Sequence, residues 1–325
     1  MKIVLCSDYN YLRQCLITCI SAIENSRESI SEIVLVGDFY SKDNLQLCKR
    51  INEYYNSNII STINLNYEAL RELLRDNKYG KSPQGQPFAF AKLVLPKIIT
   101  DSRFLYLDSD TLVLKSLDYL DNLSINCCGA VLNINDYNME STLHPKLLDG
   151  RPRNNITGPY YNSGVLLINR DFWVNNKITE QILNKAIEEP DILCDQDALN
   201  KILSKEITDL PLDYNFKTNF WFNPVLKNKI LQEKICSIDT FHDPSILHYA
   251  TKQKPWKTVG WVGPYKTYHD KFLDIVGPRY SLKNIIPNKH RNIDLEALDP
   301  DIRNRVVNYS LPEMKCLNGL DEFNC

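Results

Sequence analysis

Short apolar runs alternate with longer amphipathic stretches along the first third of the chain. Each apolar run is short enough to predict a buried β-strand, and the stretches between the runs have helical periodicity. Strands are therefore expected at residues 3–6, 33–36, 59–65 and 103–107, and helices at residues 11–23, 41–55 and 88–99. Pro96 is expected to bend the last of these helices near its end. Because alternating strands and helices are joined by right-handed crossovers, the pattern predicts an α/β fold with a mostly parallel sheet.

The fourth apolar run ends in two carboxylates, Asp108 and Asp110, which are one residue apart. Residues i and i+2 of an extended chain point the same way, so both carboxylates can converge at the carboxyl end of the strand, where open α/β sheets bind ligands. Two adjacent carboxylates repel each other unless a cation or a proton lies between them, and hard oxygen ligands suit Mg²⁺ or Mn²⁺. The alternative is a strand followed by a solvated turn, because Asp and Ser are common turn residues.

Polar residues also precede a buried strand in the second half of the chain. Another strand is expected at residues 128–133, and the strand at residues 165–169 follows Asn162, Ser163 and Gly164. The two polar side chains are expected at the entrance of the strand. Glycine at position 164 would allow another part of the molecule to approach the backbone closely.

Three later segments carry further candidate residues. Residues 194–200 predict a turn that enters a helix, with Asp195 as a possible N-cap. Residues 210–221 are aromatic and rich in asparagine, which favours the wall of a pocket. A short strand expected at residues 245–249 carries His248 near its end.

The composition is that of an ordinary soluble globular chain, with 325 residues and a formal net charge of −2. This charge gives no argument for a polyanionic partner, so no nucleic acid is expected. The ten cysteines lack Cys-x-x-Cys spacing and favour a reducing compartment. The first residues become polar too early for a secretory signal, and no apolar run approaches the roughly 20 residues that span a bilayer. We therefore predict a cytoplasmic protein.

The motifs occur in one order along the chain: Ser7-Asp8-Tyr9-Asn10, Ala91-Lys92-Leu93, the run that ends at Asp110, Tyr161–Asn169, Asp195-Gln196-Asp197 and the block from His248 to Trp256. In this order they resemble glycosyltransferase family 8, which includes glycogenin and the bacterial lipooligosaccharide galactosyltransferases. The resemblance implies a GT-A fold, a Rossmann-like sheet flanked by helices, over residues 1–265. It leaves residues 266–325 as a basic and aromatic extension, expected to be helical and packed on that domain.

The resemblance also implies roles for individual residues. Asp108, Asp110 and His248 match the ligands of a divalent metal ion, Mn²⁺ or alternatively Mg²⁺. Asp195 or Gln196 matches the family position that faces the anomeric centre of the donor sugar, and both residues are the catalytic candidates. The donor-binding positions are Asp8, Tyr9, Asn10, Lys92, Asp108, Ser109, Asn162, Ser163, Thr251 and Lys254. The family commonly has glycine where Thr251 stands, so altered phosphate packing is expected there.

Each of these residues also has an ordinary structural interpretation. Residues 8–10 can form a polar turn with a helix cap, and His248 can be a satisfied core or surface histidine. Lys92 and Lys254 can be surface lysines. Asp197 can orient its neighbours or extend the cap of its helix.

The family implies a retaining hexosyltransferase that moves glucose or galactose from a UDP-sugar to a hydroxyl of a glycan, glycolipid or glycoprotein. A glutamine is a poor nucleophile, so we expect front-face transfer in which Asp195 and Gln196 are electrostatic and positioning groups. The alternatives are a catalytically idle sugar-nucleotide-binding scaffold and a self-glucosylating, glycogenin-like primer. The basic residues 252–291 predict either peripheral contact with the inner face of a membrane or a solvated helix over the sheet. Their aromatic residues include Trp261, Tyr265, Tyr268 and Phe272.

Overall fold

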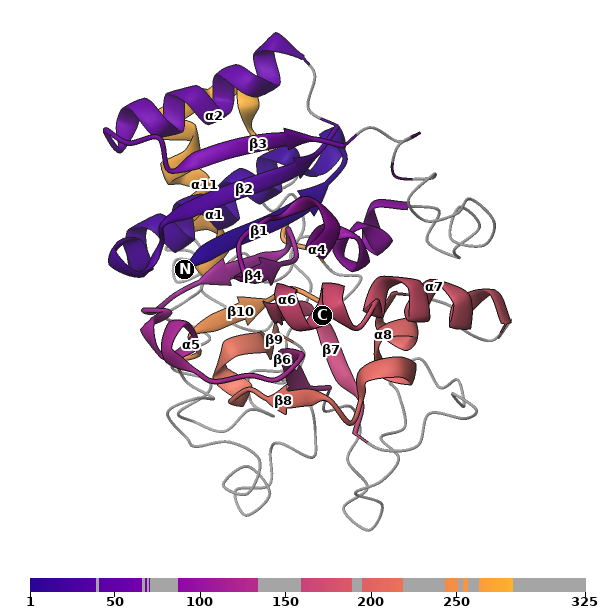
Figure 1. Ribbon diagram of the computed structural model, residues 1–325. Helices are drawn as coiled ribbons and strands as arrows, with labels where there is room; N and C mark the ends of the chain where they lie inside the picture. The colour runs from indigo at the N-terminus through magenta and orange to yellow at the C-terminus, as the bar shows by residue number, and fades with distance from the viewer. Residues whose placement is uncertain are drawn as a thin grey trace, which may run out of the picture.

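A seven-stranded sheet with the strand order β3-β2-β1-β4-β7-β6-β8 forms the centre of the molecule (Figure 1). β7 pairs antiparallel with both β4 and β6, and the remaining neighbours pair in parallel. The predicted α/β fold with a mixed, mostly parallel sheet is thereby confirmed. The computed structural model describes residues 1–38, 41–65, 68, 70, 87–133, 159–188, 195–218, 243–250, 254–256 and 263–282.

The strands of this sheet are β1 (Lys2–Ser7), β2 (Glu32–Gly37), β3 (Ile60–Asn64), β4 (Arg103–Leu107), β6 (Cys128–Leu132), β7 (Tyr161–Asn169) and β8 (Ile207–Asp209). The α-helices are α1 (Leu12–Ser26), α2 (Lys42–Tyr54), α4 (Leu95–Ile98), α5 (Asp118–Asn122), α6 (Arg170–Asn175), α7 (Ile178–Glu188), α8 (Asp195–Leu203) and α11 (Gly263–Val276). Short 3₁₀ turns include η1 (Tyr9–Tyr11), η4 (Pro87–Leu93) and η5 (Leu212–Asn215).

Each face of the sheet has its own apolar core, because successive side chains of a strand point to opposite faces. On one face Ile3 and Leu5 of β1 pack in a cluster with α1, α2 and α11. On the other face Val4 and Cys6 pack with residues of η4, α6, α7 and α8. The near-continuous apolar runs of β1, β2 and β4 are therefore explained by burial on both faces, whereas most residues of the edge strand β3 are half-buried or exposed.

A second, three-stranded sheet lies against the first. Its strands are β5 (Thr111–Val113), β10 (Ile246–His248) and β9 (Phe216–Lys217), in that order. β5 pairs antiparallel with β10, and β10 pairs in parallel with β9. β5 follows β4 after three residues, so the chain passes directly from the large sheet into the small one.

Two predicted elements were wrong in detail. The single helix predicted at residues 88–99 is instead η4 followed by the four-residue α4. Pro96 stands in the first turn of α4, where its missing N–H costs nothing, and it does not bend the end of a longer helix. β7 begins at Tyr161, which pairs with Leu132 of β6, so the residues expected at the strand entrance lie inside the strand.

The described part of the basic segment includes α11, which packs on α1 and α2. Tyr265 and Phe272 are buried, and Tyr268 Oη accepts a hydrogen bond from Asn25 Nδ2 (2.6 Å), so these aromatic rings face inward. Trp261 lies outside the described residues. α11 spans the predicted boundary at residue 265, which stays a prediction. Among the described helices, none is long and apolar enough to cross a bilayer.

The cysteines described by the structure are free and buried: Cys6, Cys15, Cys19, Cys48, Cys127 and Cys128. Burial raises the pKa of the Cys15 thiol to about 12 and that of Cys48 to about 11. The buried cysteines act as small apolar side chains of the core.

Candidate active site

The acidic pair lies where the two sheets meet. β4 belongs to the large sheet and β5 to the small one, and residues 108–110 link them. The apolar residues of β4 bury the strand on both faces, and the Asp-Ser-Asp sequence ends it with turn residues. Asp108 N–H donates to Gly164 O (2.8 Å), and Thr111 Oγ1 donates to Asp108 O (2.8 Å). These bonds fix the backbone that carries both carboxylates.

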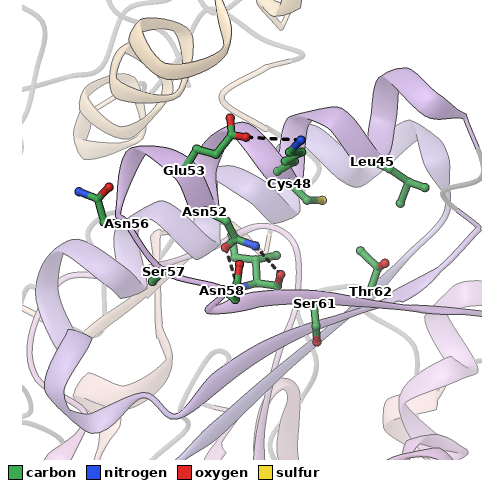
Figure 2. A pocket seen from close by; sticks show the side chains of 11 residues that line it. Leu45, Cys48, Asn52, Glu53, Asn56, Ser57, Asn58, Ser61 and Thr62 are labelled. Carbon is green, nitrogen blue, oxygen red and sulfur yellow. Dashed lines mark hydrogen bonds and ion pairs between the residues drawn. The ribbon is translucent and has the colours of Figure 1, made fainter.

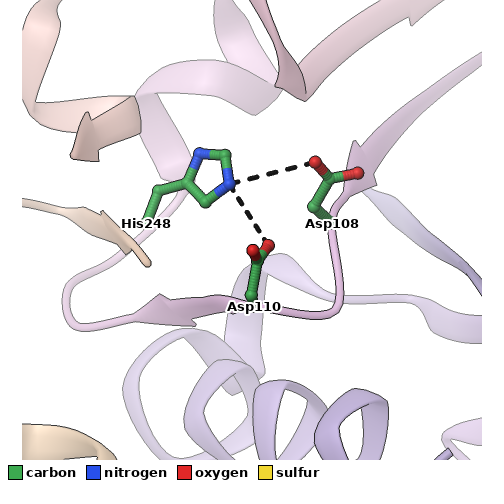
Figure 3. A group of neighbouring side chains, drawn as sticks. All are labelled: Asp108, Asp110 and His248. Atoms are coloured by element: carbon green, nitrogen blue, oxygen red, sulfur yellow. Dashed lines mark ion pairs between the residues drawn. The ribbon is translucent and has the colours of Figure 1, made fainter. Parts of the chain in front are cut away.

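His248 reaches the acidic pair from β10. The antiparallel pairing with β5 places His248 opposite Thr111, and Tyr249 N–H donates to Asp110 O (2.9 Å). Figure 3 shows His248 Nε2 facing both carboxylates, 3.2 Å from Asp110 Oδ1 and 3.9 Å from Asp108 Oδ2. One candidate ligand atom from each residue lies within 4.8 Å of the others. The structure thus brings the three predicted ligands together, from positions that are far apart in the sequence.

Gly164 leaves the space that His248 occupies. A Cβ atom at this position would lie 2.2 Å from His248 Cε1 and 2.8 Å from Asp108 Oδ2, closer than van der Waals contact allows. The close approach expected at Gly164 is therefore an approach by a side chain of the site. Glycine is required here because it has no side chain, and the Cβ of any other residue would displace the imidazole.

The electrostatics of the acidic pair fit a divalent cation. Burial raises the pKa of Asp110, but the charges and hydrogen bonds of Lys254 and His248 outweigh burial and lower it overall. Lys254 Nζ donates to Asp110 Oδ2 and to Tyr249 O, so this lysine belongs to the site instead of the open surface. Two carboxylates and an imidazole are an oxygen and nitrogen donor set that can hold a divalent metal ion.

Lys92 joins Asp108 to a second carboxylate, that of Asp195. Its Nζ lies 3.0 Å from Asp108 Oδ1 and 3.0 Å from Asp195 Oδ2, and the residue is 4% exposed. Burial lowers the pKa of Lys92, but the two carboxylates outweigh burial and raise it, so Lys92 is cationic. Tyr106 Oη donates to the same Asp108 Oδ1 (2.5 Å). The surface-lysine interpretation of Lys92 is therefore wrong.

Asp195 and Gln196 are the first residues of α8. Asp195 Oδ2 accepts a hydrogen bond from Ser163 Oγ (2.8 Å), so the described bonds of this carboxylate point into the site. Gln196 Oε1 accepts from Asn162 Nδ2 (3.0 Å) and from Ser163 N–H (3.1 Å). The predicted sugar-side residues therefore form one hydrogen-bonded cluster that continues from Lys92.

The nucleotide-side candidates lie at the same edge of the sheet. Asp8 follows β1 and caps η1, since its Oδ1 accepts a hydrogen bond from Asn10 N–H (2.9 Å), as the ordinary structural interpretation expects. Tyr9 is 62% exposed. The Tyr11 and Trp256 rings pack edge to face with centroids 6.3 Å apart, which places this turn beside the segment of Lys254.

Ser109 and Thr251 complete the predicted donor-binding positions. Ser109 stands between the two carboxylates, and its carbonyl oxygen accepts a hydrogen bond from Thr18 Oγ1 (3.4 Å). Thr251 lies outside the described residues. The effect predicted for the missing glycine at this position stays a prediction.

Two buried asparagines near the site were not singled out from the sequence. Asn200 Oδ1 accepts from Tyr161 N–H (2.6 Å) and its Nδ2 donates to Tyr161 O (2.8 Å), so it binds α8 to β7. Asn215 Oδ1 lies 2.8 Å from His248 Nδ1. Asn215 falls in the Asn-rich segment expected to form a pocket wall, which was the signal available. Asp197 Oδ1 accepts from Tyr160 Oη (2.6 Å) and so anchors the residue before β7.

A separate surface hollow lies between α2 and β3 (Figure 2). Asn52 spans it by accepting a hydrogen bond from Ile60 N–H (2.9 Å) and donating to Ile60 O (2.8 Å). The hollow shares no residue with the site, and its lining includes no charged cluster comparable to the acidic pair. The chemistry of the described residues is concentrated at the junction of the two sheets.

Two carboxylates from the end of β4, a histidine from β10 and a lysine gather at the carboxyl edge of the large sheet, which is an arrangement expected of a GT-A glycosyltransferase. The comparison with protein families agrees, because the model of glycosyl transferase family 8 matches residues 2–260. The chain belongs to that family. The resemblance found in the order of the motifs is thereby confirmed.

Individual relatives are consistent with this assignment. The General stress protein A of Bacillus subtilis is 30% identical to this chain. The match covers 52% of this chain and 59% of the length of that protein. The Lipopolysaccharide 1,2-glucosyltransferase of Escherichia coli is 26% identical over 77% of this chain and 70% of its own length. A solved structure of the galactosyltransferase LgtC with donor and acceptor sugar analogues superposes with a TM-score of 0.63, at 22% identity, over 85% of this chain and 95% of LgtC. This last likeness shows the shared fold.

Proposed function

We propose that this glycosyltransferase is a metal-dependent, retaining hexosyltransferase that moves glucose or galactose from a UDP-sugar to a hydroxyl of a glycan, glycolipid or glycoprotein. The observation that carries the proposal is the convergence of Asp108, Asp110 and His248, whose candidate ligand atoms lie within 4.8 Å of one another. Such a donor set leaves positions open on an octahedral ion, which favours Mn²⁺, with Mg²⁺ as the alternative. The relatives named as a glucosyltransferase and a galactosyltransferase support a hexose as the transferred sugar.

Asp108, Asp110 and His248 would hold the metal ion, which would supply positive charge against the diphosphate of the donor. Lys254 extends this positive region on the side of Asp110. Its side chain is 17% exposed, so water screens its charge only in part. A fixed cation at this position stabilises the negative charge that develops on UDP as it leaves.

Retention of configuration depends on the groups that face the sugar. Transfer gives the sugar oxocarbenium character as its bond to phosphate loosens. Asp195 Oδ2 is already paired with Lys92 and bonded to Ser163, which weakens it as a nucleophile. We therefore favour front-face transfer, in which Asp195 and Gln196 orient the sugar. A glycosyl adduct on Asp195, found by mass spectrometry with a slow donor, would refute this part of the proposal.

Release of UDP from a panel of UDP-sugars, with Mn²⁺, with Mg²⁺ and with a chelator, tests the main proposal. We expect release from UDP-glucose or UDP-galactose that depends on Mn²⁺ and is lost in Asp110→Asn. Asp118→Asn is the matched control, since Asp118 is an exposed carboxylate outside the site that accepts a hydrogen bond from Ser29. Absence of release from every donor favours the idle scaffold. A hexose added to the intact protein favours the self-glucosylating primer.

We also propose a cytoplasmic location, with peripheral contact at the inner face of an anionic membrane through the basic segment. The free cysteines support a reducing compartment. Because Tyr265 and Phe272 are buried, contact would have to come from the lysines and from residues outside the described part. Sedimentation with anionic vesicles at low salt tests this contact, and a protein that stays in the supernatant excludes it.

A further inference from the structure

We infer that Asn215 is a positioning residue that connects the metal ligand His248 to the sugar-side residue Gln196 by way of Asn162. The inference rests on the proposed function and adds a residue that neither the motifs nor the comparisons assign. The chain of contacts consists of four side chains. Asn215 Oδ1 lies 2.8 Å from His248 Nδ1, Asn215 Nδ2 donates to Asn162 Oδ1 (2.7 Å), and Asn162 Nδ2 donates to Gln196 Oε1 (3.0 Å).

Two backbone N–H groups fix the direction of every hydrogen bond in this chain. Gly164 N–H donates to Asn162 Oδ1 (2.9 Å), and a backbone N–H can only donate, so that atom of Asn162 must be the oxygen. The atom of Asn215 that faces it must therefore be the amide nitrogen. Asn215 then presents its oxygen to His248, and the Nδ1 of that ring must carry the proton.

The consequence for His248 is a fixed tautomer. With the proton on Nδ1, the neutral imidazole turns the lone pair of Nε2 toward Asp110 Oδ1, which is 3.2 Å away. Two lone-pair atoms at this distance need a proton or a metal cation between them, and a metal ion held by Asp108, Asp110 and His248 would replace the proton. Asn215 therefore prepares His248 as a metal ligand through Nε2, and as a neutral amide it adds no further negative charge beside the two carboxylates.

The other end of the chain is fixed in the same way. Ser163 N–H donates to Gln196 Oε1 (3.1 Å), so this atom is the oxygen and Asn162 must donate to it through Nδ2. Gln196 Nε2 makes no hydrogen bond within the described part of the chain and is the donor left for a ligand. The buried amide of Asn215 and the half-buried amide of Asn162 therefore connect His248 to Gln196.

Burial makes this arrangement specific. Asn215 is 1% exposed and His248 is 3% exposed, so water has little access to replace a lost partner. η5, which ends at Asn215, leads directly into β9, and β9 pairs with β10, the strand of His248. The position of Asn215 is therefore set by the same small sheet that positions the histidine.

Two substitutions at Asn215 separate its contact with His248 from its contact with Asn162. Asn215→Leu removes both hydrogen bonds, and we expect Mn²⁺ affinity, measured by electron paramagnetic resonance, to fall about 10-fold to 100-fold. Asn215→Asp keeps an oxygen that accepts from Nδ1–H but loses the donor to Asn162. We expect its Mn²⁺ affinity to be retained or raised, because a carboxylate on Nδ1–H makes the imidazole more basic, while kcat for UDP release falls about tenfold.

The tautomer of His248 gives a readout that needs no activity. In ¹⁵N spectra of the protein loaded with diamagnetic Mg²⁺, assigned by comparison with His248→Gln, we expect protonated Nδ1 in the unchanged protein and in Asn215→Asp. Asn52→Asp is the matched control, because Asn52 also joins its amide to a backbone N–H and C=O but lies between α2 and β3. It should leave Mn²⁺ affinity, tautomer and kcat unchanged.

The outcomes separate this inference from the proposed function. Unchanged Mn²⁺ affinity and an unchanged tautomer in Asn215→Leu would overturn the role of Asn215, whatever the donor. Equal losses of Mn²⁺ affinity and kcat in Asn215→Asp would overturn the connection to Gln196. If Asn215→Leu does not fold, Asn215→Asp alone decides through its predicted split. A protein that binds Mn²⁺ with the expected tautomer but releases no UDP from any donor would contradict the proposed function and leave the inference standing.

Discussion

The two sheets that meet at the site differ in what holds them together. β1 pairs along its length with β2 and is paired on its other side with β4, and Ile3, Val4 and Leu5 are fully buried. β9 has two residues, and β5 and β10 have three each, which is too little for independent stability. The small sheet persists because its apolar side chains share the core under α1. The large sheet is thus a scaffold, whereas the small sheet sets the geometry of the site.

Replacement of His248 should have the largest effect on activity, because this residue belongs to the small sheet that sets the geometry of the site. His248→Ala removes the one proposed metal ligand that comes from the small sheet, and the metal would supply several kcal/mol of charge stabilisation. We expect kcat/KM for UDP release to fall by about 10³-fold, with a melting temperature close to that of the unchanged protein. Activity assays with saturating Mn²⁺ and thermal unfolding measure the two quantities.

The corresponding control is Asn25→Ala. Asn25 Nδ2 donates to Val113 O (3.1 Å), so this residue contacts the small sheet from α1 without touching the site. It should lower the melting temperature and leave kcat/KM within about twofold, since a typical intramolecular hydrogen bond contributes roughly 1 kcal/mol. The division of roles is wrong if His248→Ala unfolds the protein while Asn25→Ala abolishes UDP release.

Lys92→Met should have opposite effects on stability and on metal binding. The buried ammonium is paired with Asp108 and Asp195, and its loss leaves two carboxylates without their counter-ion, a cost of about 3–5 kcal/mol. The same loss removes a positive charge 3.0 Å from Asp108, a proposed metal ligand, so Mn²⁺ affinity should rise. Chemical unfolding and electron paramagnetic resonance measure these changes.

The difference in unfolding free energy between the unchanged protein and Lys92→Met depends on pH in a way that follows from the direction of the Lys92 pKa shift. The pKa of Lys92 is raised in the folded protein, so its contribution is complete below the unfolded value of roughly 10.4 and is lost as the pH rises through the folded value. The stability difference between the two proteins should therefore be constant from about pH 6 to pH 9. Lys97→Met is the matched control, because its ion pair with Glu180 is exposed and should contribute less than about 1 kcal/mol.

Two glycines in neighbouring strands sharpen the comparison further. At Gly164 an added Cβ would lie 2.2 Å from His248 Cε1, whereas at Gly129 it would meet Leu210 Cδ2 at 2.8 Å. Gly164→Ala should displace the imidazole and lower Mn²⁺ affinity by about 10²-fold. Gly129→Ala should cost about 1–3 kcal/mol of stability through overpacking and leave Mn²⁺ affinity unchanged. If the two variants give the same loss of Mn²⁺ affinity, the clearance at Gly164 has no special role.

The sequence predicted the scaffold well because its signals are local. The ends of the strands predicted for β1, β2, β3, β4 and β6 agree with the structure to within one residue. The position of Asp108 and Asp110 followed from the end of one apolar run. The helix at residues 88–99 was wrong because apolar content cannot separate a 3₁₀ turn from an α-helix when tertiary packing decides between them.

The contacts of the site were not available from local signals. The burial of Lys92 results from the arrival of β7 and α8, and the contact between Asn215 and His248 depends on two register pairs between β9 and β10. Strands of two or three residues carry no periodicity, so nothing in the sequence specifies that register. The family resemblance supplied the residues of the site, and only the paired strands supply their geometry.

Tyr268→Phe should have the smallest effect and tests the scaffold alone. Its hydroxyl accepts a hydrogen bond from Asn25 Nδ2, which also donates to Ser21 O (2.9 Å), so the variant leaves Asn25 partly satisfied. We expect a loss of about 1 kcal/mol in unfolding free energy and no change in UDP release or Mn²⁺ affinity. Tyr119→Phe is the control, since Tyr119 is 48% exposed and its hydroxyl bonds to none of the described residues. A change in Mn²⁺ affinity in Tyr268→Phe would mean that α11 controls the small sheet, and the scaffold and the site could no longer be treated as separate.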